Sequence, residues 1–438
     1  MVIFVPQTIP GDVVDVKVYR KRKSFMEGFV VQYHKYSPLR TDPFCEHFGT
    51  CGGCKWQHLP YPEQLKYKQK HVTDSLERIG KVKVPELIPI VASDKQQEYR
   101  NKLEYTFSEN RWLSDEEVKS DREVTHRKAL GFHIPGRFDR VLDINRCYLQ
   151  PSPSNEIRTK IKDYALKNNL RFYDHIKGEG FLRNLIIRDT TIGEVMVVIS
   201  FFEEKKEDIK NLMDFAATEF PEITSLMYVV NPKANDTLND QEIKLYKGRD
   251  HIIEELEGLK FIIGPKSFFQ TNSGQALKLY RSVREFAGLS GIENVYDLYT
   301  GTGTIALFLA GQCSRVSGIE YVPEAIDDAI KNARINNIDN ARFFAGDIKD
   351  MLTPEFTEQH GHPDVMVIDP PRAGMHGDVV KQALQILPKK IVYVSCNPAT
   401  QARDINLMAE KYELKKVQPV DMFPHTHHVE NVVLMEIK

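Results

Sequence analysis

Residues 295–306 read VYDLYTGTGTIA, an apolar strand followed by a turn with two glycines and the start of a helix. Gly301 and Gly303 allow the chain to turn tightly and let its backbone approach a ligand. The same pattern also occurs where two glycines serve packing alone. From about residue 290 onward, strands alternate with helices, which predicts an α/β fold with a doubly wound parallel sheet.

Acidic residues follow the next three predicted strands. Glu320, Asp347 and Asp369 stand at or just after their ends. Because the carboxyl ends of parallel strands line one crevice, these side chains are expected at one ligand site. Glu320 suits ribose hydroxyls, and Asp347 suits an adenine amino group. Asp297 stands four residues before Gly301. This order of acidic residues and glycines along the chain resembles class I S-adenosylmethionine methyltransferases more than dehydrogenases.

Cys396 ends a further apolar strand at 391–396 and is therefore expected in the same crevice. One interpretation is a small buried core cysteine. The other is a nucleophile: a thiolate that adds to carbon 6 of a pyrimidine makes carbon 5 reactive toward a methyl sulfonium. That chemistry also needs a base, because carbon 5 must then lose its proton.

Glu430 is the predicted base. It precedes an apolar strand, 432–437, that is expected to pair at the sheet edge near the Cys396 strand. His425, His427 and His428 compete for this role, and three histidines in four residues also resemble a metal site, although Pro424 and the lack of a carboxylate set disfavour it.

Phe268 and Phe269 directly precede Gln270. A base that reacts with an enzyme must leave its stack, and an aromatic ring can receive it. The two rings are therefore predicted to stack a flipped base or to cover the cofactor, with ordinary core packing as the alternative.

The N-terminal 40 residues are basic, whereas the whole chain carries a net charge of −2. Seven Lys and Arg against three acids give this segment about +4. Its alternating apolar and polar residues predict short strands of a small nucleic-acid-binding β-barrel. Solvated charged strands are the alternative.

Cys45, Cys51 and Cys54 form a compact, glycine-rich cluster, and Cys147 can complete a set of four thiolates. Four thiolates suit an iron–sulfur cluster or structural zinc. Zinc ribbons favour two C-x2-C pairs, and this cluster has one, so the spacing favours [4Fe-4S].

Three domains are predicted: a β-barrel at 1–42, a central α+β domain at 43–250 and a catalytic domain at 251–438, on which 61–88 can pack. Helices are expected at 61–80 and 153–168, strands within 98–150, a surface loop at 108–128 and a hairpin at 181–202. The N-terminus lacks the pattern of a secretory signal, and no apolar run is long enough for a membrane span, so a cytoplasmic protein without a membrane partner is expected.

Over nearly its whole length, the chain resembles the bacterial RNA (uracil-5-)-methyltransferases, and most closely their 23S ribosomal RNA type. The matching motifs are Phe44-Cys45 to Cys54 with Gln57-His58-Leu59, Tyr99-Arg100-Asn101-Lys102, Ser267-Phe-Phe-Gln270-x-Asn272, Asp297-Leu-Tyr-Thr-Gly301-x-Gly303, Asp369-Pro-Pro-Arg372, Ser395-Cys-Asn-Pro398 and His428-Val-Glu430. Thr300 and Thr304 depart from the Cys or Asn more often found there, and the N-terminal barrel begins late.

The resemblance implies Cys396 as nucleophile, Glu430 as base, a TRAM-type RNA-binding barrel and an RNA substrate, with no obligate protein partner. It implies S-adenosylmethionine contacts by Gln270, Tyr299, Thr304, Glu320, Asp347 and Asp369. It also implies a [4Fe-4S] cluster on Cys45, Cys51, Cys54 and Cys147. Ribosomal RNA is the expected substrate, with transfer RNA as the second candidate. Two competing hypotheses are an amino-group methyltransferase and a non-catalytic RNA-binding assembly factor.

Overall fold

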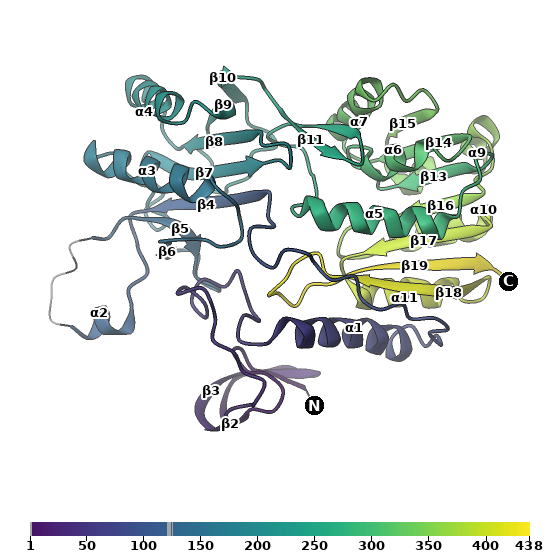
Figure 1. The fold of residues 1–438 in the computed structure, drawn as a ribbon, viewed down its shortest axis with the longest axis horizontal. Helices are drawn as coiled ribbons and strands as arrows, with labels where there is room; N and C mark the ends of the chain where they lie inside the picture. Colours follow the sequence, from purple (N-terminus) through teal and green to yellow (C-terminus); the bar gives the residue numbers. More distant parts are fainter. Residues whose placement is uncertain (1, 121–123, 125) are drawn as a thin grey trace.

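The computed structural model describes residues 2–120, 124 and 126–438. Within them, the strands form four sheets and eleven helices pack around these sheets (Figure 1). Two seven-stranded sheets lie side by side, and a small N-terminal sheet lies below them in the view of Figure 1.

The C-terminal sheet has the strand order β15-β14-β13-β16-β17-β19-β18. Its strands are β13 (Asn294–Leu298), β14 (Arg315–Glu320), β15 (Ala341–Ala345), β16 (Val365–Ile368), β17 (Lys390–Ser395), β18 (Tyr412–Val420) and β19 (Glu430–Ile437). The first five are parallel, as predicted, and β19 runs antiparallel to both neighbours. A dehydrogenase sheet of order 3-2-1-4-5-6 has no such inserted strand.

The expectation that the Glu430 strand pairs at the sheet edge is wrong in one respect. β19 lies between β17 and β18, so β18 is the edge strand. The nearly continuous apolar run of β19 is buried on both faces, as an interior strand requires.

Alternate residues of these strands point to two separate helical layers. Val295, Val365 and Val367 pack with α5 (Ser273–Ala287) and α6 (Thr304–Ala310). Tyr296 and Met366 face the opposite layer. The remaining helices of this half are α7 (Pro323–Ile335), α8 (Ile348–Met351), α9 (Pro354–His360), α10 (Gly377–Ile386) and α11 (Pro398–Met408).

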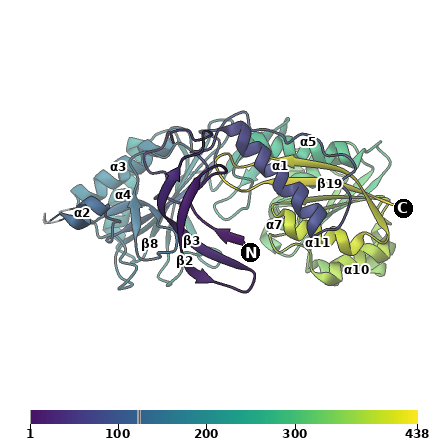
Figure 2. The ribbon, with the colours of Figure 1, turned by 90° about the horizontal axis from the view of Figure 1, so that it is seen from below.

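Helix α1 (Tyr61–Arg78) comes from the N-terminal half of the chain but packs on α11 and β18 (Figures 1 and 2). Val72 and Leu76 enter the core of the C-terminal sheet. The helix ends two residues before Gly80, where a Cβ atom would lie 3.1 Å from the Ala402 carbonyl oxygen. A glycine therefore allows α1 to approach α11 closely.

The central sheet has the order β10-β9-β8-β7-β4-β5-β6. Its strands are β4 (Lys102–Ser108), β5 (Ala129–His133), β6 (Val141–Asp143), β7 (Leu182–Asp189), β8 (Val195–Phe201), β9 (Ile223–Val230) and β10 (Ile243–Gly248). The predicted hairpin is confirmed as β7–β8. One face is covered by α3 (Ser154–Lys167) and α4 (Lys206–Glu219), and the other shares a core with α5 and the hairpin of β11 (Ile252–Leu256) and β12 (Leu259–Ile263).

The segment predicted as a loop at 108–128 contains a short helix, α2 (Asp115–Lys119), capped by Ser114. Residues 121–123 and 125 of that segment lie outside the described residues. The local capping box explains the helix, because Ser114 and Glu117 bond reciprocally to each other's backbone N–H groups.

Where a small β-barrel is predicted, the N-terminal segment forms a three-stranded sheet with β3 in the middle. Its strands are β1 (Val2–Phe4), β2 (Val13–Lys21) and β3 (Phe25–Lys35). Register shifts in the β2–β3 pair curve the ladder. The proposed domain boundaries stay a prediction. None of the described helices has the length and apolar composition that crossing a membrane requires.

Candidate active site

The turn after β13 is shaped by three residues in the left-handed region of backbone conformation. Tyr299, Gly301 and Gly303 have φ values of 64°, 54° and 79°. A tyrosine there is uncommon and often marks a functional constraint. At Gly303, a Cβ atom would lie 3.0 Å from Ala329 and Phe343, so packing also demands glycine at that position.

Asp297 holds this turn from the buried end of β13. Its carboxylate accepts hydrogen bonds from the Thr300 hydroxyl at 2.5 Å and from the Ala306 N–H at 3.1 Å. Burial raises the pKa of Asp297 to about 7, and its Oδ1 has no hydrogen-bond partner among the described residues. Thr304, expected as a cofactor contact, accepts a 3.4 Å bond from the Tyr280 hydroxyl.

The three predicted acidic residues stand at the same ends of neighbouring parallel strands. Glu320 ends β14, and its oxygens accept bonds from the Gly301 N–H at 3.2 Å and the Val322 N–H at 3.0 Å. Asp347 caps α8 and pairs with Lys349 at 2.8 Å. Asp369 directly follows β16, and burial, together with Asp297, raises its pKa to about 7.

Cys396 and Glu430 meet where β17 and β19 adjoin. Ser395 pairs with Asn431, and Cys396 and Glu430 are the next residues in that antiparallel register. Burial raises the pKa of Glu430 to about 8, and the nearby Asp369 adds to this shift. Burial also raises the pKa of the Cys396 thiol, and the negative charge of the nearby Glu430 carboxylate raises it further. Both groups therefore favour their neutral forms near pH 7.

Arg372 belongs to this site, although the sequence-based assignment gave it no role. Its positive charge lowers the pKa of the nearby Cys396 thiol, opposing burial. The Arg372 carbonyl accepts bonds from Asn397 at 3.1 Å and Thr400 at 3.2 Å, which fix its backbone. Its place three residues after Asp369, an aspartate at a strand end, is the signal that could have identified it.

The segment before α5, which contains Gln270, is held by Asn101. The Asn101 side chain donates to the Gln270 carbonyl at 2.9 Å and to the Ser273 hydroxyl at 2.8 Å. The two phenylalanines, predicted to act alike, differ: Phe269 is 4 % exposed and belongs to the core, whereas Phe268 is 71 % exposed. Core packing therefore accounts for Phe269 alone.

The three clustered cysteines, Cys45, Cys51 and Cys54, line one cavity of about 670 Å³ together with Cys147, which is distant in sequence. Burial raises the pKa of Cys54 to about 12 and that of Cys147 to about 11. Arg100, Lys102 and Arg146 line the same cavity. In the part of the chain that the structure describes, no three His, Cys, Asp or Glu side chains are close enough to hold one metal ion, so a single-ion zinc site is not assembled.

The three histidines before Glu430 do not form a metal site within the described residues either. His425 bonds through Nδ1 to Gln64 at 3.1 Å, and the rings of His427 and His428 lie 4.2 Å apart. Burial lowers the pKa of His425 and His428 to about 4, so both rings are neutral at pH 7.

Comparison with known proteins agrees with this architecture. Residues 240–438 match the family described as tRNA (Uracil-5-)-methyltransferase. A protein of Bacteroides thetaiotaomicron is 58 % identical over 100 % of this chain and 97 % of its own length, and one of Porphyromonas gingivalis is 57 % identical over 99 % and 95 %. Both carry the name uncharacterized RNA methyltransferase.

A solved structure extends the similarity to nearly the whole fold. The tRNA (uracil-54, C5)-methyltransferase of Pyrococcus abyssi, in complex with S-adenosyl-L-homocysteine, is 31 % identical, with a TM-score of 0.77 over 99 % of this chain and 95 % of that chain. These relatives favour carbon 5 of a uracil over amino-group methylation and over a non-catalytic role. The chain therefore belongs to the RNA (uracil-5-)-methyltransferase family and is an S-adenosylmethionine-dependent enzyme of that class.

Proposed function

We propose that Cys396 is the nucleophile and Glu430 the base in methylation of carbon 5 of a uridine in 23S ribosomal RNA. The observation that carries the catalytic part is the register of β17 and β19, which makes Cys396 and Glu430 neighbours beside Arg372. This chemistry needs a thiolate and a base at one point, and the Arg372 guanidinium favours the thiolate form.

The reaction begins when the Cys396 thiolate bonds to carbon 6 of the uracil ring. The electron pair of the C5–C6 double bond moves toward the carbonyl at carbon 4, and carbon 5 gains nucleophilic character. Carbon 5 then takes the methyl group of S-adenosylmethionine, whose sulfur–methyl bond breaks to leave neutral S-adenosylhomocysteine. Glu430 removes the proton from carbon 5, the double bond re-forms, and the bond to Cys396 breaks to release the thiolate.

Arg372 favours the first step because its positive charge stabilises the thiolate form of Cys396. The buried Glu430 suits the last step, since a carboxylate whose pKa is about 8 holds a proton more firmly than an exposed one.

The donor-binding residues are proposed at the turn after β13 and at the adjoining strand ends. Glu320 would accept hydrogen bonds from the ribose hydroxyls, because the Gly301 N–H fixes its carboxylate beside the turn. The further contacts are proposed for Gln270, Tyr299, Thr304, Asp347 and Asp369.

Two variants test the catalytic assignment. Cys396→Ala is expected to abolish methyl transfer from radiolabelled S-adenosylmethionine, whereas Glu430→Gln is expected to form an RNA adduct that survives a denaturing gel. Cys313→Ala is the matched control, because Cys313 packs in the core between β14 and the end of α6. Full transfer by Cys396→Ala would reject the assignment.

Cys45, Cys51, Cys54 and Cys147 are proposed to hold a [4Fe-4S] cluster. The support is that all four line one cavity, which brings Cys147 to the 45–54 loop. A cluster there would supply a cross-link between the 45–54 loop and the segment before α3. Protein purified without oxygen should absorb at about 400 nm and contain about four irons per chain. Cys54→Ser should lose both and Cys313→Ser should keep both; iron-free protein with stoichiometric zinc would overturn the proposal.

The choice of ribosomal RNA rests on the resemblance to the cluster-bearing type. Transfer RNA is the second candidate, favoured by the solved Pyrococcus abyssi relative, which is named as a tRNA methyltransferase. Nucleoside mapping of 23S ribosomal RNA and transfer RNA from a deletion strain distinguishes them. A 5-methyluridine lost from 23S ribosomal RNA supports the proposal, and one lost from transfer RNA alone rejects it.

A further inference from the structure

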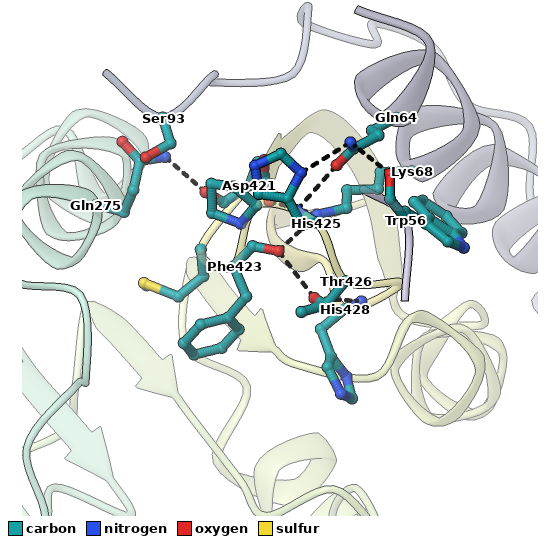
Figure 3. Close-up of polar contacts among 12 residues, drawn as sticks. Trp56, Gln64, Lys68, Ser93, Gln275, Asp421, Phe423, His425, Thr426 and His428 are labelled. Carbon is teal, nitrogen blue, oxygen red and sulfur yellow. Dashed lines mark hydrogen bonds and ion pairs between the residues drawn. The ribbon is translucent and has the colours of Figure 1, made fainter. Parts of the chain in front are cut away.

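The loop between β18 and β19, residues 421–429, is held by side chains from elsewhere in the chain (Figure 3). Gln275 donates to the Asp421 carbonyl at 2.8 Å, Asn272 to the Met422 carbonyl at 2.9 Å, and Tyr99 to the Pro424 carbonyl at 3.1 Å. The loop leads directly into Glu430, so its shape sets where that residue begins β19.

Lys68 of α1 makes the strongest of these contacts. Its ammonium group donates to Asp421 Oδ1 at 2.5 Å and to the Phe423 carbonyl at 2.9 Å. Both charged side chains are 0 % exposed. The second Asp421 oxygen accepts a bond from the Tyr61 hydroxyl at 2.8 Å. A buried ion pair is a rigid but costly connection, because removal of one partner leaves an unpaired charge.

Gln64 lies one helical turn before Lys68 and holds His425. Its Oε1 accepts a bond from the His425 N–H at 2.9 Å, and its Nε2 donates to the Trp56 and Leu59 carbonyls at 2.9 and 2.7 Å. His425 has a φ of 63°, a strained conformation for a histidine. Such strain persists only where surrounding contacts impose it.

Glu430 directly follows this loop, and its backbone pairs with Val420 of β18. Its side chain is 5 % exposed, and among the described residues no hydrogen bond holds its carboxylate. The direction of the carboxylate is therefore set by the backbone at the start of β19 and by packing. A displacement of about 1 Å at a reacting group can cost two orders of magnitude in rate.

We propose that Lys68 and Gln64, which we call the α1 clamp, are positioning residues that hold the Glu430 carboxylate against carbon 5 of the methylated adduct. This inference rests on the proposed role of Glu430. Lys68 and Gln64 contact the loop and not the Cys396 strand, so the clamp acts mainly on proton removal. The loop reaches the Cys396 side through His428, whose ring lies 3.5 Å from the Arg372 guanidinium.

The test measures methyl transfer and adduct release separately. Lys68→Met is incubated with radiolabelled S-adenosylmethionine and bulk RNA from a strain that lacks the gene, and protein-bound RNA is then separated from free methylated RNA on a denaturing gel. Adduct release should slow by about tenfold or more, with adduct accumulating as in Glu430→Gln, while binding of S-adenosylmethionine is unchanged.

Lys70→Met is the matched control. Lys70 lies on the same helix, but it is exposed and pairs with Asp74 at the surface at 3.0 Å, so this variant should release RNA at the wild-type rate. Should Lys68→Met fail to fold, Gln64→Met replaces it, because this change removes the bonds to His425 without leaving a buried charge.

Two results separate failure of the clamp from failure of the base. If Glu430→Gln accumulates adduct but a folded clamp variant releases RNA as fast as the wild type, the clamp proposal is overturned and the role of Glu430 stands. If Glu430→Gln itself accumulates no adduct, the proposed function fails first.

Discussion

Cys396 is next in register to Glu430 across the β17–β19 ladder, one step beyond the pair of Ser395 and Asn431. The nearby carboxylate raises the thiol pKa, whereas the Arg372 guanidinium lowers it. The proposed nucleophile is thus close both to the base that will later act on the same substrate and to a cation that favours its reactive form.

Adduct release should accelerate with rising pH. Glu430 removes a proton only in its ionised form, and its pKa is about 8. The ionised fraction therefore grows from roughly one tenth at pH 7 to roughly nine tenths at pH 9. Single-turnover decay of the RNA adduct, followed on denaturing gels, should quicken about tenfold over this range. A rate that does not change between pH 7 and pH 9 would contradict the assignment.

Glu430 should also make stability depend on pH. Because its pKa is raised on folding, the folded state binds the proton more tightly than the unfolded state, so the stabilisation is complete below about pH 4.5 and is lost as the pH rises through about 8. Gln at this position does not titrate. Between pH 5 and pH 9, the free energy of unfolding of Glu430→Gln should therefore rise relative to that of the wild type, by up to roughly 3–5 kcal/mol. Urea unfolding of both proteins at the two pH values measures it, and an equal difference at both would count against a buried carboxyl.

Replacing Arg372 by Met should raise the thiol pKa of Cys396, because the cation that stabilises the thiolate is lost. The rate of alkylation by iodoacetamide at pH 7.5 should fall by about tenfold. Arg372→Lys keeps the positive charge, so the alkylation rate should fall less in this variant. Peptide mapping assigns the modified residue, and the buried Cys313 should stay unmodified in both proteins. Alkylation at the wild-type rate in Arg372→Met would show that the guanidinium does not act on the thiol.

Replacing Asn101 by Ala should weaken binding of the methyl donor. The Asn101 side chain holds the Gln270 carbonyl and the Ser273 hydroxyl, so its loss loosens the segment that carries the proposed donor contact. Calorimetry should find the Kd for S-adenosylmethionine raised by about tenfold, the effect of losing one to two hydrogen bonds. Asn168→Ala, an exposed change at the end of α3, is the control and should bind as the wild type does. Equal affinity in the two variants would remove Asn101 from the binding site.

Much of the catalytic half could be predicted because the signals are local. A parallel strand that is buried on both faces has a nearly continuous apolar sequence. The glycines at 301 and 303 mark left-handed backbone positions. Glu320 and Asp369 were found at strand ends for the same reason. Periodicity and turn chemistry act over a few residues, so they can be read directly from the chain.

Contacts between distant segments could not be predicted in this way. The apolar run of β19 suits an edge strand and an interior strand alike, and its place between β17 and β18 follows from which partners bury it. Likewise, Lys68 and Asp421 lie 353 positions apart, and their pairing exists because α1 packs on α11 and β18. Local preference favours a strand or a helix but does not choose its partner; that choice depends on the summed burial and hydrogen bonding of the whole chain.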